Sequence, residues 1–308
     1  MPTATATSPT RTVPNEYVHK NATAEVLLTG WRATGPDAFA VTANWPAEHF
    51  FYESVGGFHD PLLVAETVRQ TVPLLSHASY NVPFGHRQSW SRFQYSLNLA
   101  ALASGGTPTD VELHITCTDV TRRGSVLAGM SMYIELLADG IPLGTAVTTF
   151  HNHPPKIYQR LRGDHAHSAW PTAETASVPS PVPAQRVGRR SAENVVLAPA
   201  GPRPSDSLLR IDTRHPILFD HPLDHAPGML LLEAARQSGT ALAGPGPVIA
   251  TSLDAVFTSY VELNTPCWVQ AERMPAAADG SLLVRTSARQ NDSCAFAATV
   301  GFESATAL

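Results

Sequence analysis

An almost entirely apolar run follows the dipeptide Pro227-Gly228 and predicts a long buried helix over residues 227–242. Its charged and amide side chains are Glu233, Arg236 and Gln237, which share one face because positions i, i+3 and i+4 are neighbours on a helix. Buried charge is costly unless it is paired. The pattern therefore has two explanations, an ion pair that only stabilises the fold or a functional site.

The same pattern occurs earlier in the chain, where residues 49–70 align with residues 215–237 around a one-residue gap at Gly228. The matched pairs are His49 with His215, His59 with His225, Glu66 with Glu233, Arg69 with Arg236, and Gln70 with Gln237. Upstream, His19-Lys20 aligns with Arg189-Arg190. The chain is therefore predicted to be an internal duplication that forms two similar domains.

Each predicted helix precedes segments rich in residues that favour strands. These segments are residues 89–99, 111–119, 125–138 and 141–150 in the first copy, and 249–263, 267–273, 281–289 and 294–302 in the second. Further short extended segments are expected at 25–28, 38–42 and 49–52, and Pro73 is expected to kink or end the first helix. An antiparallel sheet curled around its helix buries both elements, which predicts an α+β fold in each copy.

The domain boundaries follow from composition. Residues 1–13 are predicted to be a loose tail, 14–163 the first domain, and 189–308 the second. Residues 164–188 are rich in Pro, Ala and Ser, which is typical of a linker.

Composition also narrows the functional classes. A net charge of −5 gives no general basic field for nucleic acid, and the sequence has no apolar segment long enough to span a membrane. Three cysteines without a CxxC motif suit a reducing cytoplasm. The pairs His151-x-His153 and His165-x-His167 have no carboxylate or thiolate at ligand spacing, so we expect neither a metal site nor a cofactor.

Two resemblances connect these motifs to known proteins. The run Pro-Gly-x-Leu-x-x-Glu-Ala-x-x-Gln at residues 227–237 resembles the active-site helix of the hotdog-fold hydroxyacyl-carrier-protein dehydratases, which lack the Arg. A nearly full-length resemblance is to the A-factor synthase (AfsA) family of γ-butyrolactone biosynthesis. It rests on residues 18–29, on Pro155, Tyr158 and Leu161-Arg162-Gly163, and on residues 221–237. This resemblance implies a double hotdog fold.

The resemblance also implies a reaction. A β-ketoacyl group passes from an acyl carrier protein thioester to a hydroxyl of dihydroxyacetone phosphate, and the ester then closes by intramolecular aldol condensation to a butenolide phosphate. The alternatives are a hotdog dehydratase or thioesterase, and a non-catalytic acyl-binding double hotdog.

Such a transfer needs a base, a donor to the oxyanion and cations for the phosphate. Glu233 is the candidate base, with a pKa that burial should raise, and the backbone at Gly228 is the candidate oxyanion donor. Arg236 either binds phosphate or holds Glu233 ionised, and Glu66 and Arg69 are the counterparts in the first copy. The candidate substrate-binding residues are His49, His59, His215, His221, His225, Gln70 and Gln237.

Overall fold

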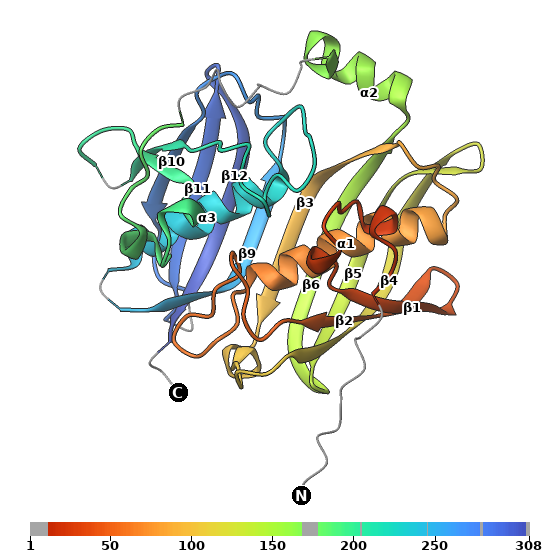
Figure 1. Cartoon of the computed structure of the whole chain (residues 1–308), viewed down its shortest axis with the longest axis horizontal. Coiled ribbons are helices and arrows are strands. Elements are labelled where there is room, and N and C mark those ends of the chain that lie inside the picture. The colour runs from red at the N-terminus through yellow and green to blue at the C-terminus, as the bar shows by residue number, and fades with distance from the viewer. Residues whose placement is uncertain (1–11, 168–177, 204, 245, 278–279, 306–308) are drawn as a thin grey trace, which may run out of the picture.

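The computed structural model of the chain describes residues 12–167, 178–203, 205–244, 246–277 and 280–305. Within these ranges twelve strands form one antiparallel sheet, in the order β1-β2-β4-β5-β6-β3-β9-β12-β11-β10-β8-β7 (Figure 1). The strands of the first half are β1 (Leu28–Gly35), β2 (Ala38–Trp45), β3 (Arg87–Leu97), β4 (Thr109–Arg123), β5 (Val126–Ala138) and β6 (Ile141–His153). Those of the second half are β7 (Leu197–Pro199), β8 (Asp206–Leu209), β9 (Val248–Phe257), β10 (Trp268–Arg273), β11 (Leu282–Gln290) and β12 (Ser293–Ser304).

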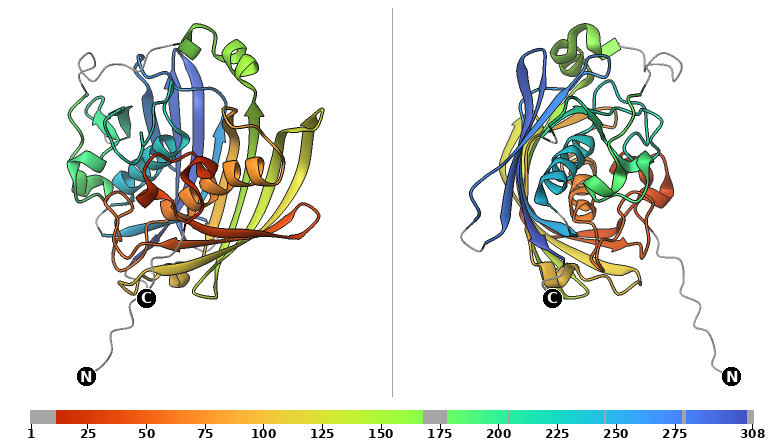
Figure 2. Two further views of the ribbon diagram at one scale, coloured as in Figure 1. Left: turned by 45° about the vertical axis from the view of Figure 1, so that its right-hand side comes forward. Right: turned by 90° about the vertical axis from the view of Figure 1, so that its left-hand side faces the viewer.

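The helices are few in comparison. Those of the described residues are α1 (Leu62–Ala78), α2 (Pro155–Arg162) and α3 (Gly228–Ala243), with 3-10 turns η1 (Asn15–Val18), η2 (Thr23–Glu25), η3 (Leu99–Leu102), η4 (Gly163–His167), η5 (Ala184–Val187) and η6 (Ala192–Asn194). Helices α1 and α3 lie side by side on the concave face of the sheet (Figure 2). Each is a buried helix wrapped by half of the sheet, so the predicted double hotdog is confirmed.

The two halves meet at the centre of the sheet. Strands β3 and β9 pair antiparallel from Arg92↔Val256 to Ser96↔Ser252, and from this seam outward both halves repeat the same strand order. The Tyr95 hydroxyl donates to the carbonyl of Ala250 across the seam. This arrangement is a pseudo-two-fold that relates the copies, and it leaves the seam strands with no free edge.

Close packing fixes α3 on its sheet. A Cβ at Gly239 would lie 2.3 Å from Phe302 on β12, so only glycine allows this approach of helix and sheet. Helix α1 continues through Pro73 to Ala78, so the prediction that Pro73 could end the helix was wrong. Its apolar side chains are buried on nearly all sides, which stabilises the helix in spite of the lost N–H.

Two predicted extended segments differ from the structure. Residues 49–52 form no strand, because His49 Nδ1 accepts the backbone N–H groups of Phe51 and Tyr52 and turns the chain. Of residues 25–28, Glu25 ends the 3-10 turn η2, Val26 and Leu27 belong to no strand, and β1 begins only at Leu28. Helix α2 was not predicted from the sequence.

The predicted alignment of His19-Lys20 with Arg189-Arg190 differs from the structure by one residue. Lys20 contacts Glu66 in the first half and Arg189 contacts Glu233 in the second, so Lys20 corresponds to Arg189 and His19 to Gly188. His19 and Gly188 are both left-handed C-caps, at φ of 53° and 68°. The conformation, and not the charge of adjacent residues, decides this register.

The predicted tail and linker lie partly outside the described residues, at 1–11 and 168–177. The end of the linker segment packs against the core, where Ala184 and Val187 are buried. No described helix is both long and apolar enough to span a membrane.

Candidate active site

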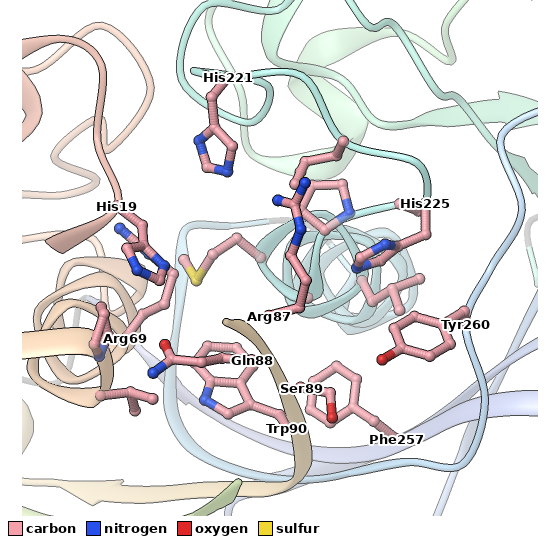
Figure 3. A pocket seen from close by; sticks show the side chains of 18 of the residues that line it. His19, Arg69, Arg87, Gln88, Ser89, Trp90, His221, His225, Phe257 and Tyr260 are labelled. Carbon is pink, nitrogen blue, oxygen red and sulfur yellow. The ribbon is translucent and has the colours of Figure 1, made fainter. Parts of the chain in front are cut away.

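A cavity of about 740 Å³ lies between the two halves of the molecule (Figure 3). Its walls come from α1, the start of β3, the loop that leads into α3, and the segment after β9. Figure 3 shows His19 and Arg69 on the side of α1 and His225 and Tyr260 on the side of α3, with Arg87 between them. The cavity therefore brings together residues that are distant in the sequence.

His225 and Asp224 form a dyad at the wall of this cavity. The His225 Nδ1–H donates to Asp224 Oδ1 at 2.7 Å, which leaves Nε2 as the unprotonated nitrogen of the neutral ring. His225 lines the cavity, and its Nε2 has no hydrogen bond within the described part of the chain. A carboxylate that fixes the histidine tautomer in this way is the arrangement of a general base.

Helix α2 holds the dyad in place. The Tyr158 hydroxyl donates to both oxygens of Asp224 at 2.6 and 2.9 Å, and Arg162 donates to Asp224 while it forms a bidentate pair with Glu262. Burial raises the pKa of Asp224, but hydrogen bonds from His225 and Tyr158 and the nearby charges outweigh it and bring the pKa well below the usual range. Asp224 is therefore an anion at neutral pH.

The N-terminus of α3 also faces the cavity. Its N-cap Pro227 gives no side-chain cap, and the backbone N–H groups of Gly228 and Met229 have no partner in the described ranges. A Cβ at Gly228 would lie 2.8 Å from the ring of Trp90, so the glycine is needed for the Trp90 ring to pack against this helix end. The unpaired N–H groups and the helix dipole favour a negative charge here.

Glu66 lies at the opposite wall with its cations. Its carboxylate accepts from Arg69 Nε and Nη2, each at 2.8 Å, and Lys20 Nζ is 3.1 Å away. Burial raises the pKa of Glu66, but Arg69 and Lys20 together lower it far more, so this carboxylate stays ionised. Glu66, Arg69 and Lys20 all line the cavity.

Glu233 has the equivalent contacts but does not line the cavity. Its carboxylate is fully buried and accepts from Arg189, Arg236 and Gln237. The expected rise of its pKa was wrong. Burial alone raises it, but Arg189 and then Arg236 lower the pKa to about 2. A carboxylate so strongly paired is a weak base, and the predicted role of Glu233 as the general base has no support in the geometry.

The site that would be the pseudo-symmetric partner of the cavity is filled. Asp60 caps the N-terminus of α1 by accepting from the backbone N–H of Leu62 at 2.9 Å, and its other oxygen pairs with Arg189 at 3.0 Å. Arg189 also donates to the carbonyl of Phe51, whose ring is completely buried. The corresponding position at α3 is Ala226, which leaves that helix end open. Asp60 and Arg189 therefore occupy the N-terminal end of α1, whereas the N-terminal end of α3 faces the cavity.

Comparisons with known proteins agree with this architecture. A family model described as the A-factor biosynthesis hotdog domain matches residues 1–153 and 170–303. The chain belongs to the A-factor biosynthesis hotdog family.

Two relatives in the family cover almost the whole chain, and both are named 2-oxo-3-(phosphooxy)propyl 3-oxoalkanoate synthase. The protein of Streptomyces virginiae is 42% identical over 95% of this chain and 98% of its own length. That of Streptomyces coelicolor is 39% identical over 94% and 90%. Among solved structures, the 12:0-ACP thioesterase from Umbellularia californica has a TM-score of 0.54 at 8% identity and covers 86% of this chain and 94% of its own. That likeness shows the fold alone.

Only some of the histidines and glutamines that were predicted to bind substrate line the cavity. His221 and His225 line the cavity, whereas His49, His59, His215, Gln70 and Gln237 do not. His49 and His215 each accept two backbone N–H groups through Nδ1, and Gln70 and Gln237 bind the backbone near residues 25 and 194. His59 is bonded to Thr109. These five residues support the fold by their contacts.

Three residues of the dyad and its support were missed as site candidates, namely Asp224, Tyr158 and Arg162. All three stood in the motifs that indicated the family. The sequence feature that could have indicated them is the adjacent pair Asp224-His225, since a carboxylate next to a histidine can orient its ring. Such a pair forms a dyad only if the loop brings the two side chains together. That condition depends on α2, which the pattern did not predict.

Proposed function

We propose that this protein transfers a 3-oxoalkanoyl group from a thioester to a hydroxyl of dihydroxyacetone phosphate, giving 2-oxo-3-(phosphooxy)propyl 3-oxoalkanoate. The observation that supports this most is the Asp224–His225 dyad beside the uncapped N-terminus of α3 in one cavity. The names of the family relatives, which align over nearly the full chain, support the same product.

The proposed transfer begins with proton removal. His225 Nε2 takes the proton of the acceptor hydroxyl as its oxygen attacks the thioester carbonyl carbon, and Asp224 stabilises the imidazolium that forms. The C–O bond forms and the carbonyl oxygen becomes an oxyanion. When this intermediate collapses, the C–S bond breaks and the proton on His225 passes to the departing thiolate, so charge and protons balance.

The helix end supplies the second part of the chemistry. Backbone N–H groups of Gly228 and Met229 are proposed to donate to the oxyanion, where the α3 dipole adds favourable potential. Because both groups are unpaired in the described structure, they need not break another bond to do so. Arg236 and Glu233 contribute by fixing α3 to the segment that contains Arg189.

The remaining wall of the cavity suits an acyl chain. Met229, Leu231 and Phe257 give it an apolar surface on the side of α3, and Val72 lines it on the side of α1. We propose an acyl carrier protein as the thioester donor and the cytoplasm as the location. The ester is then proposed to close to a butenolide phosphate by intramolecular aldol condensation, in which the carbon between the two carbonyl groups of the acyl chain attacks the ketone carbon of the acceptor and one water is lost.

Mass spectrometry tests the proposal. The purified protein is incubated with a 3-oxoacyl carrier protein with and without dihydroxyacetone phosphate, and the ester is expected only when both are present. Free 3-oxo acid without the acceptor would instead indicate a thioesterase. His225→Gln should lose ester formation, and the matched control His114→Gln should keep it, because His114 is exposed on β4 and lies outside the cavity. Full turnover by His225→Gln would refute the proposed base.

A further inference from the structure

Four basic side chains from different segments line the cavity. His19 follows η1, Arg69 is on α1, Arg87 begins β3, and His221 is in the loop before α3. Figure 3 shows His19, Arg69 and His221 on the side of the cavity away from Tyr260, with Arg87 between them and His225. We call these four residues the cationic cluster.

Three carboxylates also line the cavity, on Glu16, Glu66 and Asp220, but none of them forms an ion pair with Arg87. Glu66 is shared between Lys20 and Arg69, and it occupies Nε and Nη2 of Arg69, so Nη1 has no bond among the residues described. Arg87 forms no ion pair with any described carboxylate, and its guanidinium lies 5.8 Å from the Tyr158 ring centre. Two guanidinium groups therefore have donors available to an anion in the cavity.

His221 adds an unused polar atom. Its Nδ1 is buried without a hydrogen bond, and the nearest carboxylate oxygen, on Asp220, is 3.8 Å away. The Asp220 carboxylate accepts instead from the backbone N–H groups of Asn21 and Ala22. A buried polar atom without a partner is costly, which is consistent with a ligand that completes its bonding.

The protonation of His19 follows from its neighbours. His77 Nδ1 donates to the carbonyl of Val82, so the Nε2 of neutral His77 is an acceptor, and His19 Nε2 must donate to it at 2.8 Å. The neutral His19 therefore has its lone pair on Nδ1. Burial, then His77, Arg69, His221 and Arg87, lower the pKa of His19 to about 3. For His221, burial and then Arg69, Lys20 and Arg87 lower the pKa, while Asp220 opposes them.

The second half of the molecule provides an internal comparison. The position of His19 is Gly188 in that half, and Gly188 is not among the residues that line the cavity. Both residues are left-handed, a conformation that favours glycine, yet the open site has a histidine there. The first half therefore has an ionisable side chain at this position, and that side chain lines the cavity.

We propose that His19, Arg69, Arg87 and His221 bind the dianionic phosphate monoester of the acceptor, and that phosphate binding is coupled to proton uptake by the two histidines. The identity of the acceptor rests on the proposed function. The negative charge of the bound dianion offsets the repulsion from the neighbouring cations, so the protonated histidines become favourable hydrogen-bond donors to the phosphate. The phosphate then lies at the α1 side and directs the free hydroxyl toward His225.

Isothermal titration calorimetry with dihydroxyacetone phosphate tests the binding, without any thioester present. Titrations at pH 7.5 in PIPES and in Tris, which differ in ionisation enthalpy, measure the protons taken up. The wild type should bind one ligand with net proton uptake, and unphosphorylated dihydroxyacetone should bind at least about 100-fold more weakly. Arg87→Gln and His19→Gly should each weaken phosphate binding by roughly tenfold or more, and His19→Gly should also reduce the proton uptake.

Arg285→Gln is the matched control, because Arg285 is an exposed arginine on β11 outside the cavity. It should change neither affinity nor proton uptake. Equal affinity in Arg87→Gln, His19→Gly and the wild type would overturn the proposal. In steady-state kinetics, a raised KM for the acyl carrier protein alone would assign the cluster to the phosphate of the donor and would also overturn it. Phosphate binding without ester formation would refute the proposed function but leave this site intact.

Discussion

Glu233→Gln separates a structural role for the duplicated ion pair from a catalytic one. The carboxylate is fully buried between Arg189 and Arg236, and glutamine keeps its shape but removes its charge. Two buried guanidinium groups are then left without their counterion. Removing one member of a buried pair typically costs about 3–5 kcal/mol.

The pKa gives a similar magnitude. Arg189 and Arg236 overcome burial and lower the pKa of Glu233 from 4.5 to about 2, a difference worth about 3 kcal/mol of stability at neutral pH. Because the folded pKa is the lower one, this stability is fully present above about pH 4.5 and is lost as the pH falls toward 2. The variant should lack this component of acid destabilisation.

Thermal unfolding from pH 7 to pH 3, together with the ester assay, measures both effects. We expect the melting temperature of Glu233→Gln to fall by roughly 5–10 °C at pH 7, and its activity per folded molecule to remain within about threefold of the wild type, since Glu233 does not line the cavity. An unchanged unfolding curve with a hundredfold loss of activity would refute this reasoning and restore Glu233 as a catalytic base.

Three further variants test the site itself. His225→Gln should lower kcat by about 10²–10⁴-fold without lowering the melting temperature, as measured by ester formation and thermal unfolding. Asp224→Asn should keep the fold but lower kcat by about 10²-fold or more, since the histidine loses its orienting carboxylate; a normal pH–rate profile at the parent rate would contradict this positioning role. Gly228→Ala should displace the Trp90 ring, because its Cβ would lie 2.8 Å away. A destabilisation of about 1–3 kcal/mol and altered Trp fluorescence are expected, and a crystal structure with Trp90 unmoved would exclude the clash.

The duplication, both buried helices and most strands are predictable from the sequence. Local patterns were sufficient because the apolar positions after Pro227 and the β-forming segments repeat in both copies. The dipeptide Asp139-Gly140 is typical of a two-residue hairpin turn, and both residues adopt the positive φ that such a turn needs, at 48° and 78°. The apolar pattern around Glu233 and Arg236 also predicts that both side chains are buried, and the structure confirms this.

Which polar groups face the cavity depends on contacts between distant segments of the chain. A helical pattern gives the face on which Glu233 lies but not what packs opposite it, and the opposing Arg189 is 44 residues away. The same limit applies to Asp224, which depends on Tyr158 at a separation of 66 residues. One copy is open and the other filled because Asp60 caps α1 where Ala226 leaves α3 free. The assignment of the site therefore depends on long-range contacts, which the period of the sequence does not encode.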